Sequence, residues 1–94
     1  MEPHFLVHHS DDSVGVIVVE GVEAAQTLTG WVMDEEKNIS VETRQPIPLG
    51  HKVALKDLAV GDTVMKYGED IGKMVGPAEI GGHVHTHNCK TKRW

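Results

Sequence analysis

Short apolar runs alternate along the chain with polar or glycine-containing segments, and this pattern predicts a mainly β domain. The runs are rich in Val, Ile and Thr, and each is long enough only for a short strand. No stretch keeps apolar residues at helical spacing over about three turns. At most one or two short helical turns are therefore expected: a short helix in residues 22–26, and either a short turn or a single helical turn in residues 57–60, before Gly61. The expected strands span residues 5–8, 13–20, 27–33, 38–43, 51–55, 63–67, 71–75 and 83–87.

The segments between the expected strands carry the residues of tight turns. Residues 34–38 are polar and lie between two expected strands, which favours a hairpin. Pro46 and Pro48 prevent regular pairing in the next segment, because each proline removes a backbone donor and fixes φ. Gly15, inside the second expected strand, predicts a bulge or a close approach of another part of the backbone.

One short sequence pattern recurs along the chain. Residues 58–64 resemble residues 78–84, and residues 22–28 are a looser third copy. In the two better copies, Gly61 and Gly81 supply the freedom at positive φ that tight turns often require. We interpret the pattern as a tight turn that starts a strand, because the copies are too short to form the repeats of a solenoid.

Length and composition indicate one domain that covers residues 1–94. Hydrophobic residues make up 39% of the chain but aromatic residues only 4%, so the core must depend on aliphatic side chains and Met. The formal net charge is −5, and the basic cluster of Lys90, Lys92 and Arg93 is short, which argues against nucleic-acid binding. No membrane-spanning run and no signal peptide is visible, and Cys89 is the single cysteine. These features predict a protein of the cytoplasm.

The segment 82–88 is the most informative for chemistry, because it places a histidine at every second position. On a strand, His83, His85 and His87 would line one face, with neighbours about 6 to 7 Å apart. Two adjacent histidines could then reach a single metal ion, whereas all three could not easily do so. Imidazole is also a proton donor or acceptor near neutral pH. Spacing alone leaves three interpretations open: metal ligation, contact with an anionic substrate, and a polar face that is solvated or lies at a subunit interface.

Other polar residues are weaker candidates. His51 and Lys52 follow the proline-rich segment, where they could bind a carboxylate or sulfonate or simply belong to an exposed loop. Residues 66–70 are expected to form a hairpin tip. Cys89 follows the histidines, but no group with an assigned role would activate it as a nucleophile. Three further histidines are expected at the surface: His4, His8 and His9.

Several sequence blocks together resemble the SAF-type domain of the altronate and galactarate dehydratase family. They are residues 47–58, which include Gly50-His51-Lys52, residues 61–62, residues 66–72, and residues 83–88 with Lys90 and Thr91. The resemblance covers nearly the whole chain, and it implies a β-clip fold. Members of this family carry the domain either at the start of a long chain or as a separate small subunit. This chain is most similar to a separate small subunit.

The resemblance also implies a function, which we state as an expectation. A small subunit of this kind works with a large catalytic subunit that holds a divalent metal, iron, and it is inactive alone. The reaction implied is β-elimination from a small anionic 2-hydroxy acid, with sulfite as the leaving group. Water is the leaving group in the alternative, where the substrate is a sugar acid. Two further alternatives are a non-catalytic module for acid binding or assembly, and a small metal-binding protein built on the histidine segment.

By the same resemblance, the site residues are expected at the junction with the large subunit. Catalytic roles are expected for His85 and His87. No metal ligand is assigned in this chain, and neither a nucleic acid nor a membrane is expected as a partner. The residues expected to bind substrate are His51, Lys52, His83 and Asn88.

Overall fold

The computed structural model describes residues 2–66 and 69–91, and within them the protein is built from nine strands and no helix. The mainly β prediction is confirmed. Accordingly, the described part of the chain contains no helix that is long and apolar enough to cross a membrane. The strands are β1 (Phe5–Val7), β2 (Val14–Ile17), β3 (Thr27–Val32), β4 (Lys37–Glu42), β5 (Lys52–Ala54), β6 (Thr63–Lys66), β7 (Glu69–Met74), β8 (His83–Val84) and β9 (Cys89–Lys90).

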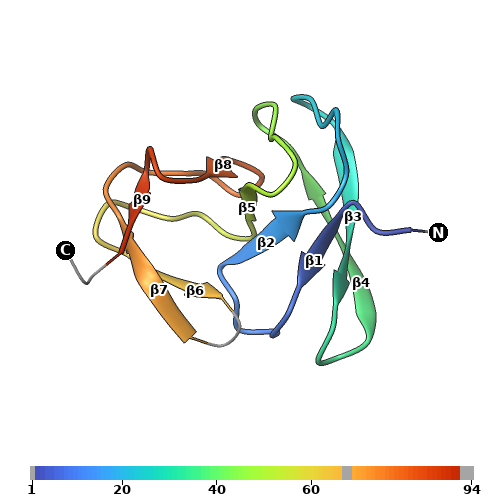
Figure 1. Ribbon diagram of the computed structural model, residues 1–94, viewed down its shortest axis with the longest axis horizontal. Coiled ribbons are helices and arrows are strands. Elements are labelled where there is room, and N and C mark those ends of the chain that lie inside the picture. The colour runs from blue at the N-terminus through green and yellow to red at the C-terminus, as the bar shows by residue number, and fades with distance from the viewer. Residues whose placement is uncertain (1, 67–68, 92–94) are drawn as a thin grey trace.

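The strands form two sheets in a molecule of 39 × 27 × 19 Å (Figure 1). The larger sheet has six strands in the order β4-β3-β1-β2-β5-β8. β1 and β3 pair in parallel, and the other neighbours in this sheet pair antiparallel. β3 and β4 form the hairpin that the polar segment 34–38 predicts, and Glu36 has a φ of 49° in its turn. In Figure 1, β1, β3 and β4 lie at the end near the N-terminus, and β2, β5 and β8 lie toward the middle.

The smaller sheet contains β6, β7 and β9 in the order β6-β7-β9, at the opposite end of the molecule from β3 and β4 (Figure 1). β6 and β7 are antiparallel, with a register shift between Val64 and Met65. Part of the expected hairpin tip, Tyr67 and Gly68, lies outside the described residues, as do Lys92 and Arg93 of the basic cluster.

A short turn unit organises the connections between strands. The unit begins with a residue in an isolated antiparallel bridge, and a strand begins five positions later. Between these points one residue has a positive φ. The amide of that residue donates a hydrogen bond to a carbonyl at the end of another strand or just beyond it. The bridges pair Val22 with Ile47 and Leu58 with Ala78. The positive-φ residues are Ala25 (59°), Gly50 (85°), Gly61 (91°) and Gly81 (85°).

The turn unit explains the recurring sequence pattern and corrects one expectation. The three sequence copies correspond to units that begin at Val22, Leu58 and Ala78, and a fourth begins at Ile47. Residues 22–26 form a turn, so the short helix expected there is wrong. The physical reason is that Val22 pairs with Ile47 and Ala25 adopts a left-handed φ, which a right-handed helix does not allow.

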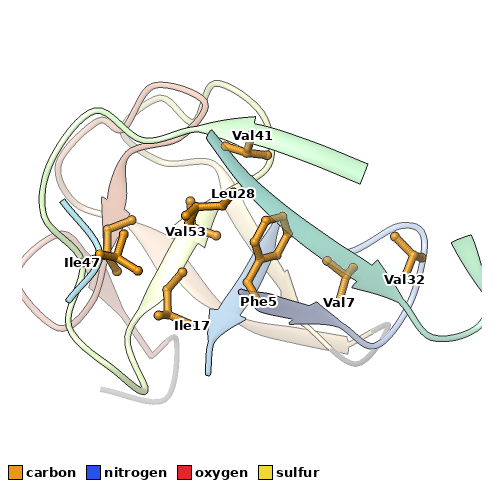
Figure 2. Close-up of a cluster of buried hydrophobic side chains, with 9 residues drawn as sticks. Phe5, Val7, Ile17, Leu28, Val32, Val41, Ile47 and Val53 are labelled. Atoms are coloured by element: carbon orange, nitrogen blue, oxygen red, sulfur yellow. The ribbon is translucent and has the colours of Figure 1, made fainter. Parts of the chain in front are cut away.

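Two clusters of buried apolar side chains form the core, and β5 contributes to both. Val53 belongs to the first cluster and Ala54 to the second, because successive side chains of a strand point to opposite faces. The first cluster comprises Phe5, Val7, Ile17, Val22, Leu28, Val32, Val41, Ile47 and Val53 (Figure 2). The second comprises Val14, Ala54, Leu58, Val64, Met74 and Val84. The faces of β5, and of the site next to it, are therefore fixed by the core.

Phe5 lies in the middle of the first cluster (Figure 2). Two glycines make room for its ring. A Cβ atom on Gly30 would lie 2.0 Å from the Phe5 ring, and one on Gly15 would lie 2.7 Å from it. The close approach predicted at Gly15 is therefore present, although the main neighbour is a side chain. β2 keeps a regular register with both of its neighbours, so the alternative of a bulge at Gly15 is not realised.

Candidate functional site

The pairing of β5 with β8 brings two histidine segments together. Lys52 lies opposite Val84, and Val53 lies opposite His83. Extending this antiparallel register by one residue places His51 opposite His85. Because side chains alternate between faces, His51 and His83 lie on the same face of the sheet as Val53. The side chain of Lys52 leaves the strand on the opposite face.

Four imidazole rings gather at this edge of the larger sheet: His51, His83, His85 and His87, which we call the histidine cluster. The centroids of the His51 and His85 rings are 3.6 Å apart, with an angle of 12° between the ring planes. The His51 and His83 rings are stacked at 5.0 Å, and the His83 and His87 rings are tilted at 4.8 Å. The structure therefore brings together all four histidines that the sequence marked as site residues.

One hydrogen bond links two rings of the histidine cluster. Nδ1 of His51 lies 2.7 Å from Nε2 of His83. One of these nitrogens must carry the proton and the other must be free to accept it, so the bond exists only while at least one ring is neutral. Burial, and then the nearby His87, His51, His85 and Lys52, lower the pKa of His83 below its ordinary value of 6.5. The pair is thus held short of full protonation near neutral pH.

The expected strand 83–87 is wrong beyond its second residue. β8 ends at Val84, and residues 85–88 form a turn that Asn88 closes. Oδ1 of Asn88 accepts a hydrogen bond from the His85 amide at 3.0 Å, and Nδ2 donates to the His83 carbonyl at 2.9 Å. Local side-chain bonds of this kind satisfy the backbone without a strand partner, which is why the ladder stops here. His83, His85 and His87 consequently do not line one face of a strand.

Asn88 is 6% exposed, and its backbone is also engaged. Its carbonyl accepts the amide of Val75 at 2.8 Å, which connects the turn to the end of β7. The amides of Asn88 and Cys89 both donate to the His85 carbonyl. Both polar atoms of the Asn88 side chain are therefore used inside the turn, and a contact of Asn88 with substrate stays a prediction.

His85 has one nitrogen that the fold closes off. Its Nδ1 atom is buried and, among the described residues, has no hydrogen-bond partner. Burial, and then the charges of His51, Lys52 and His87, lower the pKa of His85 below 6.5. The ring is therefore kept neutral near neutral pH.

Lys52 lies at the border of the histidine cluster. It is half-buried, and among the described residues no carboxylate forms an ion pair with it. Burial and then the charge of Lys66 lower the pKa of Lys52, while the neighbouring Cys89 acts in the opposite direction. Burial raises the pKa of Cys89, so the thiol stays protonated and is a poor nucleophile.

The described residues of this chain do not fit a metal centre. No group of three or more His, Cys, Asp or Glu side chains in residues 2–66 and 69–91 is arranged to hold a metal ion. At the histidine cluster, the facing nitrogens of His51 and His83 instead form a hydrogen bond.

Three residues outside the histidine cluster make contacts that bear on the predictions: His4, His9 and Gln45. Nδ1 of His4 accepts the Thr29 amide at 2.9 Å, so this histidine supports β3. Nδ1 of His9 accepts the Asp11 amide at 3.1 Å, so this histidine takes part in a local turn. Gln45 was not expected at the site, but its Oε1 accepts the His83 amide at 2.8 Å. No pattern around Gln45 would have identified it, because the contact depends on the path of the proline-rich segment.

Comparison with protein families finds a match between residues 3–92 and the model described as the altronate/galactarate dehydratase SAF domain. All of the predicted site residues fall inside this match.

Comparison with curated proteins finds relatives of two kinds. The chain is 56% identical over 94 residues to the "(2R)-sulfolactate sulfo-lyase subunit alpha" of Chromohalobacter salexigens, with 100% of both chains covered. It is 65% identical over 63 residues to the protein of that name from Paracoccus pantotrophus, covering 67% of this chain and 94% of the relative. It is also 31% identical over 87 residues to the altronate dehydratase of Bacillus subtilis, covering 93% of this chain but 16% of that enzyme.

Proposed function

This chain belongs to the altronate/galactarate dehydratase SAF domain family, and from that premise we propose that it is the small subunit of a two-component (2R)-sulfolactate sulfo-lyase. The observation that carries the proposal is the end-to-end match, at 56% identity, to a protein named as subunit alpha of such an enzyme. The altronate dehydratases match the same stretch only as a small part of a much longer chain, 16% in one case and 15% in the other. The higher identity therefore favours the sulfo-lyase.

The proposed reaction is a β-elimination. A base removes the proton from C2 of sulfolactate, the C3–S bond breaks, and sulfite leaves with the bonding electron pair. The enol that remains takes up a proton at C3, loses the proton of its C2 hydroxyl, and becomes pyruvate. Negative charge develops on the substrate during this step, so fixed hydrogen-bond donors and cations near it stabilise the transition state.

In this proposal, the histidine cluster and Lys52 provide such groups. His85 and His87 contact the substrate during the elimination, and His51, Lys52 and His83 bind its anionic groups. Support comes from the half-buried Lys52, which forms no ion pair within residues 2–66 and 69–91, and from the four imidazoles gathered beside it. An anion with two negative groups, such as a sulfonate and a carboxylate, suits an edge that carries these donors.

A large catalytic subunit completes the site. Two cavities of the chain, of about 380 and 410 Å³, are lined by other residues and include no member of the histidine cluster. The cluster lies instead at β8, the edge strand of the larger sheet, where a partner can cover it. A divalent metal, iron, belongs to the large subunit in this proposal. We also assign the complex to the cytoplasm and the two-sheet architecture to the β-clip fold.

A second candidate function is that of a small subunit of altronate dehydratase, which eliminates water from a sugar acid. The observation in its favour is the 31% and 36% identity to altronate dehydratases. Hydroxide is a poorer leaving group than sulfite, so that reaction requires a general acid at the leaving oxygen. Neutral imidazoles with lowered pKa values are less suited to this task than to donating hydrogen bonds to a stable anion.

Co-production of the chain with its large subunit tests the proposal and separates the candidates. The purified pair would be supplied with ferrous iron and with either sulfolactate or altronate. Sulfite and pyruvate from sulfolactate would support the sulfo-lyase. A keto sugar acid from altronate, without sulfite from sulfolactate, would transfer the assignment to the dehydratase. A pair that assembles but turns over neither substrate would leave a binding or assembly module.

A further inference from the structure

We infer that His85 serves the site as a neutral hydrogen-bond donor, presenting Nε2–H to an oxyanion of the ligand, and that Asn88 is the residue that positions it. The identity of the ligand, a sulfonate or carboxylate, rests on the proposed function. The protonation state and the role of Asn88 rest on the geometry of this chain alone.

The buried side of the His85 ring determines its charge. A protonated imidazole has an N–H on both nitrogens, and each needs an acceptor. Nδ1 of His85 is buried without one, so protonation would leave an unpaired donor inside the protein. The charged groups that act on His85 are His51 from the start of β5, Lys52 on β5 and His87 in the same turn. All of them are basic, and they lower the pKa of His85 further.

The same buried nitrogen determines the tautomer of His85. A neutral imidazole has a single N–H, on Nδ1 or on Nε2. With the proton on Nδ1, a buried N–H would have no acceptor. With the proton on Nε2, the buried atom is only an unused lone pair, which is the less costly defect. The geometry therefore favours the Nε2–H tautomer, and Nε2 is not closed off as Nδ1 is.

Asn88 holds the backbone that carries His85. Its side chain holds the His85 amide and the His83 carbonyl at once, so it fixes the backbone on both sides of Val84. The His51 ring then stacks on His85 at 3.6 Å and restricts rotation of the imidazole. Asn88 does not need to touch the ligand to matter, because it sets where Nε2 of His85 points.

Stabilisation of negative charge and removal of the C2 proton belong to different groups in this assignment. His85 in the Nε2–H form can stabilise negative charge, but it has no accessible lone pair with which to remove a proton. Another group, either His87 or a residue of the large subunit, therefore removes the proton from C2. Lys52 supplies the full positive charge that a neutral His85 lacks.

A matched set of substitutions in the assembled two-subunit enzyme separates a donor from a base. The amide nitrogen of Gln reaches about as far as Nε2 of His, and that of Asn about as far as Nδ1, and neither amide is basic. We expect His85→Gln to keep kcat/KM for sulfolactate within about tenfold of the wild type, and His85→Asn and His85→Ala to lose about a hundredfold. An equal loss in His85→Gln and His85→Ala would overturn the donor role.

A measurement that needs no turnover tests the same inference independently. Long-range ¹H–¹⁵N correlation spectra of the full chain, labelled with ¹⁵N-histidine, report which ring nitrogen carries the proton. At pH values near neutral, His85 is expected as the Nε2–H tautomer, with its signal assigned by its absence in His85→Gln. A proton on Nδ1, or on both nitrogens, would overturn the inference even if the enzyme is a sulfo-lyase. A wild-type complex without turnover would instead count against the proposed function, whatever the tautomer.

The role of Asn88 has its own variants. Asn88→Asp keeps an acceptor for the His85 amide but loses the donor to the His83 carbonyl, and Asn88→Ala loses both. We expect Asn88→Ala to give a mixture of His85 tautomers and to lower kcat more than it raises KM, with Asn88→Asp intermediate. An unchanged tautomer and an unchanged kcat in a folded Asn88→Ala complex would contradict the positioning role.

Discussion

Nδ1 of His51 lies 2.7 Å from Nε2 of His83, although the two residues are 32 positions apart in the chain. The antiparallel pairing of β5 with β8 creates this contact, and the turn after β8 adds His85 to the other side of the arrangement. The bond couples the protonation of the two rings. It also links His51, which directly precedes β5, to the edge strand β8, where a partner can reach the site.

The protonation of the histidine cluster should appear in the pH dependence of stability. The folded-state pKa values of His83 and His85 lie below 6.5, so in the range just below 6.5 the unfolded chain binds more protons than the folded one. The free energy of unfolding should therefore fall as the pH is lowered through this range and should level off above it. Urea unfolding at a series of pH values measures this slope, and His83→Gln should reduce it. A slope that is the same in His83→Gln would show that the coupling lies elsewhere.

Gly81 should be far less replaceable than Gly50, although both have a φ of 85°. A Cβ on Gly81 would lie 1.8 Å from the carbonyl oxygen of Glu42, whereas a Cβ on Gly50 would meet nothing within 4 Å. Gly50→Ala should cost about 1 kcal/mol of unfolding free energy, the strain of a left-handed alanine. Gly81→Ala should cost about 3 kcal/mol or more, because the backbone must also move. Equal midpoints of chemical denaturation for the two variants would argue against this packing.

Thr43 should stabilise the first turn unit through its hydroxyl. The side chain is 1% exposed, and Oγ1 donates to the Glu23 carbonyl while it accepts the Gln26 amide at 3.0 Å. Thr43→Val keeps the shape but leaves both groups without a partner, so it should cost about 2 kcal/mol. Thr43→Ser keeps the hydroxyl and should cost about 1 kcal/mol for the lost methyl group. If thermal unfolding ranks Ser below Val, packing and not hydrogen bonding dominates at this position.

Lys52 should matter for substrate binding, and Lys56 should not. Lys52 is half-buried beside the histidine cluster and has no carboxylate partner among the described residues, whereas Lys56 is exposed near the cavity lined by Val7 and Leu55. A charge-assisted hydrogen bond contributes about 1.5 to 3 kcal/mol. Lys52→Gln should therefore raise the KM of the complex for sulfolactate about tenfold or more, and Lys56→Gln should change it less than about twofold. A Lys52→Gln complex with normal KM would remove Lys52 from the site.

The strands and the hairpin were predictable from the sequence, because they depend on local patterns. Short runs rich in β-branched residues identified most of the strands, and the polar segment 34–38 identified the β3–β4 hairpin. Gly61 and Gly81 were also correct as positive-φ positions. The looser copy of the same pattern at 22–28 competed with a helical interpretation, and only the pairing of Val22 with Ile47 decides between them.

The site was predictable as a set of residues but not as a geometry. The histidine pattern of 82–88 suggested a strand face, yet Asn88 turns the chain after Val84 by bonding to the backbone on either side of it. Alternation of residue types contains no information about such side-chain bonds. The contacts of His51 with His83 and of Gln45 with the His83 amide depend on long-range register and on the path of the proline-rich segment. Neither can be read from local sequence.

The most direct test of the account is an add-back experiment with sulfolactate. The large subunit would be purified alone with ferrous iron, and this chain would then be titrated into it while sulfite and pyruvate are both measured. The account predicts no turnover with either chain alone, and equal amounts of sulfite and pyruvate that rise with added chain until the large subunit is saturated. Sulfite release by the large subunit alone, unchanged when this chain is added, would contradict the assignment of the chain as a required subunit of the lyase.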